Sequence, residues 1–436
     1  MAALPMSALP NAEGFDQTLA LRREGYRFIT NRCEALKSDA FVARLMLTRV
    51  VCLRGAQAAE LFYSGERVTR VRAMPMSVLL PDFGNVQTLT GEAHRARKKL
   101  FLELANPRRV RELCAVTAQE WLATFERLPQ GAPVVLFDVT REILTRAVLR
   151  WSGLICDETE IRKRLEEFSE TIEATGAIGP RRWRARLLRW RSERCGRRII
   201  SDVRAGSLPI SSNAPVGLIA AHRDAGGELL SARTAAVELM TLLRTTVAVA
   251  RYIVFAALAL DREPRAWTQI ADGDEDYLSR FVAEVRRLAP FFPWVGGRAR
   301  CDFEWNGHSF RAGDRLLLDL YGTNRHPLHW PQPDTFDPDR YLIRPDGAFD
   351  YVAQGGGTAS ESHRCPGERP TVELIKTAVR LLTRTLRYRV PEQDLTVDLT
   401  RVPALPANGF IISDIRVTAS RAEASRPLSP RDRNRA

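Results

Sequence analysis

Cys365 stands in a loop that presents its sulfur as a metal ligand. Three glycines, Gly355 to Gly357, precede it, and Pro366 and Gly367 follow it directly. Glycines let the backbone approach a flat group closely, and a Pro-Gly pair turns the chain. Apolar residues recur at helical spacing after this turn, so the sulfur lies at a helix N-terminus, where backbone N–H groups favour a thiolate. These features favour a haem-thiolate centre over an inert, buried cysteine.

Three charged residues upstream form a second pattern. Glu284 and Arg287 are three residues apart in a segment with helical spacing, so their side chains share one helical face and can pair. Arg340, in the sequence Phe-Asp-Pro-Asp-Arg, follows as a third charged partner. A Glu-x-x-Arg pair is common on protein surfaces, but its place ahead of the cysteine loop predicts a structural cluster.

A cation interrupts the most apolar predicted helix. Residues 231–260 contain neither Gly nor Pro, and Arg244 lies inside this segment. Burying a guanidinium is costly unless an anion meets it, so Arg244 pairs with either a protein carboxylate or a substrate carboxylate. Arg251, seven residues on, lies on nearly the same helical face. A haem propionate, a surface acid and a second substrate anion are its possible partners.

The order of these motifs resembles that of the cytochrome P-450 superfamily. The segments starting at Val237, Tyr321 and Gln354 are more narrowly similar to its fatty-acid peroxygenase branch, and the similarity runs from about residue 10 to 418. The resemblance implies a mainly α fold with small β-sheets, in which a triangular helical domain encloses haem b. It also implies that Cys365 is the axial iron ligand, and that the partners are a fatty acid and hydrogen peroxide, with no obligatory redox partner.

In the family, the residue that matches Arg244 binds the carboxylate of the fatty acid. A planar guanidinium can hold both carboxylate oxygens, which places the α or β carbon nearest the oxidant. Conventional monooxygenases deliver protons through an acid-alcohol pair, which Leu243–Thr246 lacks. The substrate carboxylate is expected to act as the general acid-base in its place, and the thiolate to favour a ferryl oxidant. We therefore expect hydroxylation near the carboxylate, with minor decarboxylation.

The resemblance assigns further positions near the haem. Gln87 matches a distal residue that is Gln in hydroxylating members and His in decarboxylating ones, so it favours hydroxylation, although it could be an ordinary loop residue. His94, Lys98 and Arg364 are expected to bind the cofactor, the first two through the haem propionates.

Two further features concern the substrate cavity. Phe291 and Phe292 resemble residues that line the acyl channel, although aromatic clusters are more often plain core. Thr245 stands where the family usually has proline, which could alter the helix over the iron.

Composition sets the remaining limits. The 436 residues are 45% hydrophobic, which predicts one catalytic domain over 1–418, with a disordered basic tail over 419–436. Seven cysteines without a C-x-x-C pair argue against a zinc site or disulfide framework and fit a cytoplasmic protein. Residues 1–11 lack the features of a signal peptide or membrane anchor. The pair Asn306-Gly307 predicts a hairpin turn.

Positive charge is concentrated in one segment. The net charge is +13, and residues 181–198 contain nine arginines and one acid. Trp183, Leu187 and Trp190 recur at helical spacing there, which indicates an amphipathic helix. We expect this apolar stripe to dock on the domain, while the alternatives are attraction of fatty acids or membrane surfaces and nucleic-acid binding.

Two other functions compete with a peroxygenase. An ordinary monooxygenase would use O2 and a ferredoxin or flavodoxin partner, which the missing acid-alcohol pair disfavours. A haem sensor or nucleic-acid-binding protein would use the basic segment and tail, but it leaves Arg244 unexplained.

Overall fold

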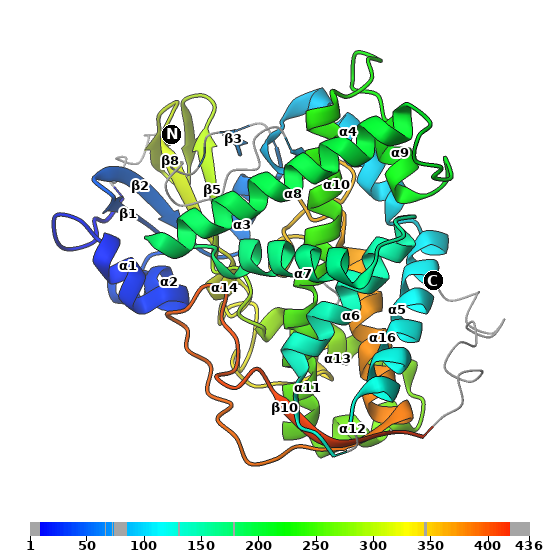
Figure 1. The fold of residues 1–436 in the computed structure, drawn as a ribbon. Helices are drawn as coiled ribbons and strands as arrows, with labels where there is room; N and C mark the ends of the chain where they lie inside the picture. The colour runs from blue at the N-terminus through cyan, green and yellow to red at the C-terminus, as the bar shows by residue number, and fades with distance from the viewer. Residues whose placement is uncertain are drawn as a thin grey trace.

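Most of the secondary structure is α-helix, with the strands gathered in small sheets, as the sequence predicts (Figure 1). This computed structural model describes residues 9–418 except 66, 72, 74–84, 130, 178 and 344–346. The predicted tail, 419–436, lies outside the described residues, so the division into a domain and a tail stays a prediction.

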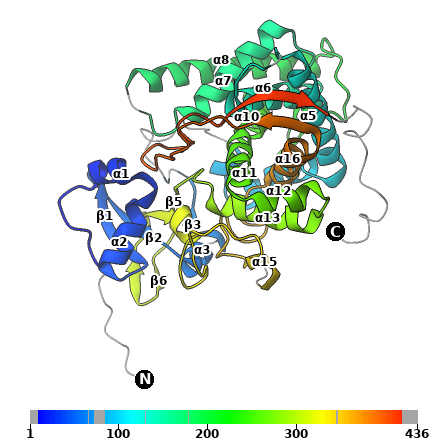
Figure 2. The same cartoon turned by 90° about the horizontal axis from the view of Figure 1, so that it is seen from below.

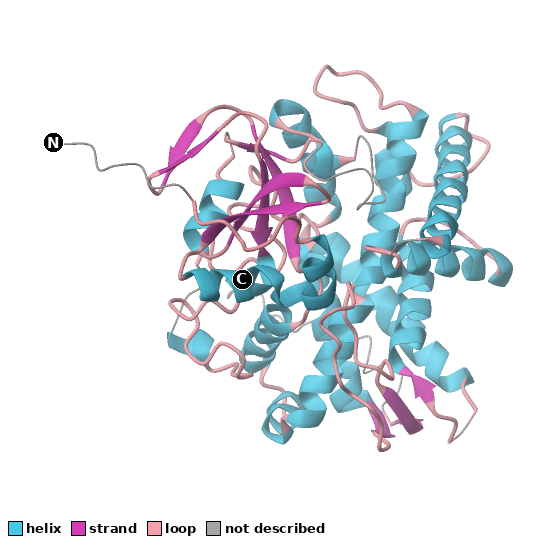
Figure 3. Cartoon of the chain, turned by 90° about the vertical axis from the view of Figure 1, so that its left-hand side faces the viewer, coloured by secondary structure: helices cyan, strands magenta, loops and turns pink. Residues whose placement is uncertain are grey.

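The strands form three sheets, and Figure 3 shows the strands gathered in two regions of the molecule. The largest has the order β1 (Ala40–Leu45), β2 (Thr48–Leu53), β8 (Arg315–Asp319), β5 (Trp294–Ala299), β3 (Val68–Thr69). The second has the order β4 (Val134–Val135), β10 (Ile411–Val417), β9 (Leu386–Arg389). The third is the predicted hairpin of β6 (Phe303–Trp305) and β7 (His308–Phe310). Asn306 and Gly307 turn it with φ of 49° and 74°, the left-handed values of a tight hairpin turn.

The other helices surround two consecutive central helices, α10 (Ala232–Ala248) and α11 (Ala250–Arg262). The longer helices are α4 (Gly91–Leu104), α5 (Pro107–Arg127), α6 (Leu136–Trp151), α7 (Glu158–Glu173), α8 (Pro180–Arg204), α10 (Ala232–Ala248), α11 (Ala250–Arg262), α13 (Glu275–Leu288) and α16 (Glu368–Arg380). The shorter ones are α1 (Thr18–Glu24), α2 (Phe28–Leu36), α3 (Ala56–Tyr63), α9 (Pro215–Ala221), α12 (Pro264–Ala271), α14 (Leu320–Thr323) and α15 (Arg340–Ile343). Single turns or irregular helices occupy η1 (Gly25–Arg27), η2 (Val86–Thr88) and η3 (Leu381–Thr385).

The predicted helix over 231–260 is present as α10 and α11, separated at Val249. Ser231 caps its start by accepting a hydrogen bond from the Thr234 amide at 3.1 Å. By length and composition, 232–262 could cross a membrane, but 67% of its most apolar window is buried inside the protein. It is therefore the central helix of the core, which explains both its length and its apolar character.

Helix α8 corrects one prediction. Its inner face carries Gly196, where an added Cβ would lie 3.1 Å from the Met240 side chain of α10. The stripe of Trp183, Leu187 and Trp190 lies on the other side, with exposures of 67%, 55% and 50%. The expectation that this stripe docks on the domain is wrong, because small residues on the inner face already make the close contact with α10.

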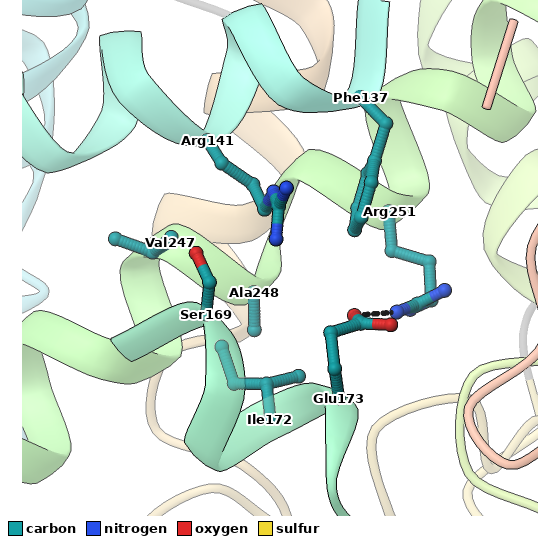
Figure 4. Close-up of a pocket in the computed structure, with 8 residues that line it drawn as sticks. All are labelled: Phe137, Arg141, Ser169, Ile172, Glu173, Val247, Ala248 and Arg251. Carbon is teal, nitrogen blue, oxygen red and sulfur yellow. Dashed lines mark hydrogen bonds and ion pairs between the residues drawn. The ribbon is translucent and has the colours of Figure 1, made fainter. Parts of the chain in front are cut away.

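Arg251 joins helices rather than facing a ligand. Its guanidinium pairs with Glu173 at the end of α7 (Figure 4) and donates to the Ala404 carbonyl at 2.6 Å. The Arg251 side chain is almost fully buried, and the Phe137 ring lies 5.1 Å away. Of the partners left open by the sequence, a protein acid is the one observed.

Candidate active site

The cysteine loop is held by its own backbone ahead of α16. The Cys365 amide donates to the Gln354 carbonyl at 2.8 Å. Gly355 has a φ of 96°, and a Cβ there would lie 3.1 Å from the Arg364 Cα. The loop thus needs glycine at 355 both for its left-handed backbone and because the backbone of residue 364 passes close to it.

Opposing effects act on the Cys365 thiol. Burial raises its pKa, while a hydrogen bond from the Gly367 amide and the positive charges of Lys98 and Arg286 act to lower it. Glu368, in the first turn of α16, acts to raise it, but Arg286 and Arg364 both pair with this carboxylate at 2.5 Å. The predicted position at a helix N-terminus is observed, and two arginines offset the nearby acid.

Cys365 lines a large cavity, with a volume of about 1570 Å³. Helix α10 also lines this cavity, through Arg244, Thr245 and Thr246. The two threonine hydroxyls donate to the Thr241 and Leu242 carbonyls one turn earlier, at 2.8 and 2.9 Å. The helix therefore continues through Thr245 without the family's proline.

Arg244 shares its surroundings with a second arginine. Burial lowers the pKa of Arg244 to about 10, with Glu193 opposing this shift, so the side chain is still a cation at pH 7. Arg189 of α8 also lines the cavity, and it donates to Glu193 at 2.8 Å. Burial, followed by the Arg244 charge, lowers the pKa of Arg189 to about 10. Arg189 and Arg244 thus bring two guanidinium groups to one cavity, beside the carboxylate of Glu193. Guanidinium groups favour an anionic ligand.

His94 and Lys98 lie on one face of α4, as predicted, and both line the cavity. The Lys98 ammonium donates to the Ser362 carbonyl and, at 2.7 Å, to the Arg364 carbonyl. Burial lowers the pKa of Lys98 to about 8 and that of His94 to about 4. The His94 and His363 rings lie 4.1 Å apart. The structure thus brings both residues beside the cysteine loop, together with Arg364, which also lines the cavity.

The remaining predicted ligand contacts meet in the same space. Gln87, in η2, and the aromatic residues Phe291 and Phe292 all line the cavity. The Phe291 ring lies 5.2 Å from Tyr252 and 4.4 Å from Phe292. The predicted distal residue and the predicted channel residues therefore share one cavity with Arg244.

The predicted charged cluster lies outside the cavity, with Glu284 and Arg287 fully buried and Arg340 partly buried. Glu284 accepts from Arg287 at 2.7 and 2.8 Å and from Arg340 at 3.0 Å. The Asp337 amide and the Tyr341 hydroxyl also donate to it, at 3.0 and 3.2 Å. These contacts tie α13 to the segment that leads to the cysteine loop.

Comparisons with known proteins support the resemblance. The family model described as Cytochrome P450 matches residues 273–392. A mutant of cytochrome P450SP alpha is 40% identical, covers 93% of this chain and 100% of its own, and superposes with a TM-score of 0.90. The chain belongs to the cytochrome P-450 superfamily.

Two further structures place this P-450 in the fatty-acid peroxygenase branch. Wild-type cytochrome P450EX alpha with myristic acid is 36% identical, with 94% and 100% of the two chains covered and a TM-score of 0.90. An OleT mutant in complex with arachidonic acid is 29% identical, with 95% and 100% covered and the same TM-score.

The residues of the cavity fit a haem. Among the described residues, no three His, Cys, Asp or Glu side chains gather as a metal site. An iron at Cys365 would therefore take its other ligands from a macrocycle, as haem iron does. The cavity is large enough for haem and substrate together. Lys98 and Arg364 supply positive charge for its propionates, and His94, whose lowered pKa leaves it neutral at pH 7, can offer a hydrogen bond.

Arg189 is the site residue that the sequence reasoning missed. Its signal was present, because Arg189 lies on the helical face of α8 that also carries Ala185, Ser192 and Gly196. An arginine among small residues on an inward face differs from the other arginines of this segment.

Proposed function

We propose that this P-450 uses hydrogen peroxide to hydroxylate a fatty acid at the α or β carbon. The observation that carries the proposal is the half-buried Arg244, which shares one cavity with the Cys365 thiol. The haem would supply the oxidation chemistry when bound. The protein residues bind and orient the substrate.

Arg244 would hold the substrate carboxylate through two charge-assisted hydrogen bonds. This contact would fix the acid end of the chain inside the cavity that Cys365 also lines, so that the first carbons are the ones presented for reaction. The acyl chain would pack against Phe291 and Phe292, whose rings line the cavity. Regioselectivity near the carboxylate follows from the anchored headgroup.

The bound carboxylate would also move the proton. The hydroxyls of Thr245 and Thr246 donate to backbone carbonyls, so neither is oriented as a donor into the cavity. A carboxylate held by Arg244 can take a proton from peroxide and return it to the leaving oxygen.

Gln87 supports hydroxylation as the main outcome, with decarboxylation as a minor one. The seven free cysteines support a cytoplasmic location.

Product analysis tests this function. Haem-loaded protein is mixed with fatty acids of several chain lengths and hydrogen peroxide, without a reductase, and products are identified by mass spectrometry. We expect 2- or 3-hydroxy acids, and loss of nearly all product in Arg244→Ala. Arg233→Ala is the matched control, because Arg233 is an exposed arginine in the first turn of the same helix.

A conventional monooxygenase predicts the opposite. Product would then require a ferredoxin or flavodoxin with its reductase, and peroxide alone would give none. That result would assign Arg244 a structural role and overturn the proposal.

A further inference from the structure

An apolar stripe lies on the outer face of α8. Trp183, Leu187 and Trp190 are at least half exposed, and they follow one another at helical spacing. Figure 2 shows α8 at the outer edge of the molecule, next to α7. Large apolar side chains exposed together on a charged helix mark a contact surface. The inner face of the helix is already occupied by the contact with α10.

Arginines border this stripe on both sides. The Arg186 guanidinium lies 5.2 Å from the Trp183 ring, and that of Arg194 lies 5.5 Å from the Trp190 ring. Arg191 is exposed between them. Within the described part of the chain, Arg186 and Arg194 form no ion pair with a carboxylate. Arg191 acts electrostatically on Glu167 of α7. The charges of Arg186 and Arg194 are therefore available to an external anionic partner.

The same helix begins at the cavity. Arg181 and Arg182, in its first turn, line the cavity, as do residues 175–177 of the connection from α7. Thr18 of α1 and Met46 of the β1–β2 turn also line it. Further exposed apolar side chains lie on or next to these elements, namely Phe15, Leu19 and Leu47. Residues of the cavity wall are thus neighbours in the chain of two groups of exposed apolar side chains.

We propose that the outer face of α8 docks on an anionic phospholipid bilayer. Trp side chains prefer the boundary between headgroups and acyl chains, and arginines beside them reach the phosphates. A basic helix with an apolar stripe lies in the plane of such an interface. Docking would bring residues 175–177, Arg181 and Arg182, which line the cavity, next to the surface in which fatty acids partition.

Charge and shape favour this occupant over two others. A nucleic acid would satisfy the arginines but would leave two indoles and a leucine without an apolar partner. A second copy of the chain would bring two strongly basic helices together, which repel each other. An anionic bilayer matches the charge and the apolar stripe together.

Vesicle flotation tests the proposal without turnover, so its outcome is independent of the proposed function. Haem-loaded protein is mixed with vesicles of phosphatidylcholine alone or with 30% phosphatidylglycerol, a composition chosen for the assay (about a third anionic lipid). We expect binding to the anionic vesicles, weakened by salt. Arg186→Ala with Arg194→Ala should lower the partition coefficient on the order of 20-fold, since each arginine near an anionic surface contributes about fivefold. Trp183→Ser with Trp190→Ser should lower it roughly tenfold.

Matched controls separate this face from general surface properties. Arg387→Ala with Arg389→Ala removes two exposed arginines from β9, and Ile155→Ser with Leu328→Ser removes two exposed apolar side chains elsewhere. Both should bind like the wild type. Equal binding to neutral and anionic vesicles, or unchanged binding in the α8 variants, would overturn the proposal. So would binding to a DNA duplex without vesicle binding, or a dimer that Trp183→Ser with Trp190→Ser dissociates.

Discussion

Replacing Glu193 by Gln should tighten the binding of fatty acids. Glu193 accepts a hydrogen bond from Arg189 and acts electrostatically on Arg244, so it supplies negative charge where the substrate carboxylate is proposed to bind. The substitution removes that charge and keeps a side chain of the same size. The substrate carboxylate would then meet the two guanidinium groups without repulsion from the Glu193 charge.

The expected size of the effect follows from the charges and their exposure. Two like charges about 8 Å apart repel by about 2 kcal/mol at an effective dielectric constant of 20. The Glu193 side chain is 26% exposed, and solvent screening reduces this to about 1 kcal/mol. The dissociation constant should therefore fall about fivefold.

The assay is optical titration of the haem-loaded enzyme with a fatty acid and with the primary alcohol of the same length. The alcohol should bind equally to wild type and variant, because it carries no charge. Glu166→Gln is the matched control, since Glu166 pairs with Arg184 on the surface at 2.6 Å and does not line the cavity. Weaker binding of the acid in Glu193→Gln would refute the electrostatic reasoning and indicate that Glu193 mainly orients the arginines.

Three further predictions concern stability and haem binding. Glu284→Gln leaves Arg287 buried without its carboxylate, so the free energy of unfolding in urea should fall by about 3–5 kcal/mol, against little change for Glu34→Gln at an exposed site. Gly355→Ala should lower the haem content of purified protein, whereas Gly307→Ala, which has a positive φ but open space, should not; equal loss in both would contradict the role of close packing. Burial raises the pKa of Asp319 to about 6, so the folded state holds this proton more tightly than the unfolded state and stability falls as pH rises from about 4 to 6. The free energy of unfolding in urea should fall less steeply across this pH range in Asp319→Asn than in the wild type. An equal pH dependence in the two proteins would contradict the assignment.

Local patterns in the sequence predicted much of the fold and the cysteine loop. The turn at Asn306-Gly307 and the helix after Gly367 depend on the backbone preferences of neighbouring residues, which follow from the residue types alone. The Glu284–Arg287 pair was predicted from helical spacing and its partner Arg340 from the order of the motifs. The burial of the pair was not predicted, because it depends on packing between distant segments.

The helix of 180–204 shows where local reasoning fails. The spacing of apolar residues predicted the helix correctly but its inner face wrongly. Large apolar side chains such as Trp183 and Trp190 usually face the core, which is why this stripe was expected to dock on the domain. The structure instead packs Gly196 and its small neighbours against α10, since small residues allow close helix contact. Contacts between residues far apart in the sequence could not be predicted either, as the pairing of Arg251 with Glu173 shows.

The most direct test of the account compares the catalytic efficiency, kcat/KM, with hydrogen peroxide for a fatty acid and for the alcohol of equal length. In the wild type, the acid should be favoured by about 10²- to 10³-fold, the value of a buried charge pair of about 3–4 kcal/mol. In Arg244→Ala this preference should disappear, through loss of activity on the acid. A variant that keeps the preference for the carboxylate would contradict the claim that Arg244 binds it.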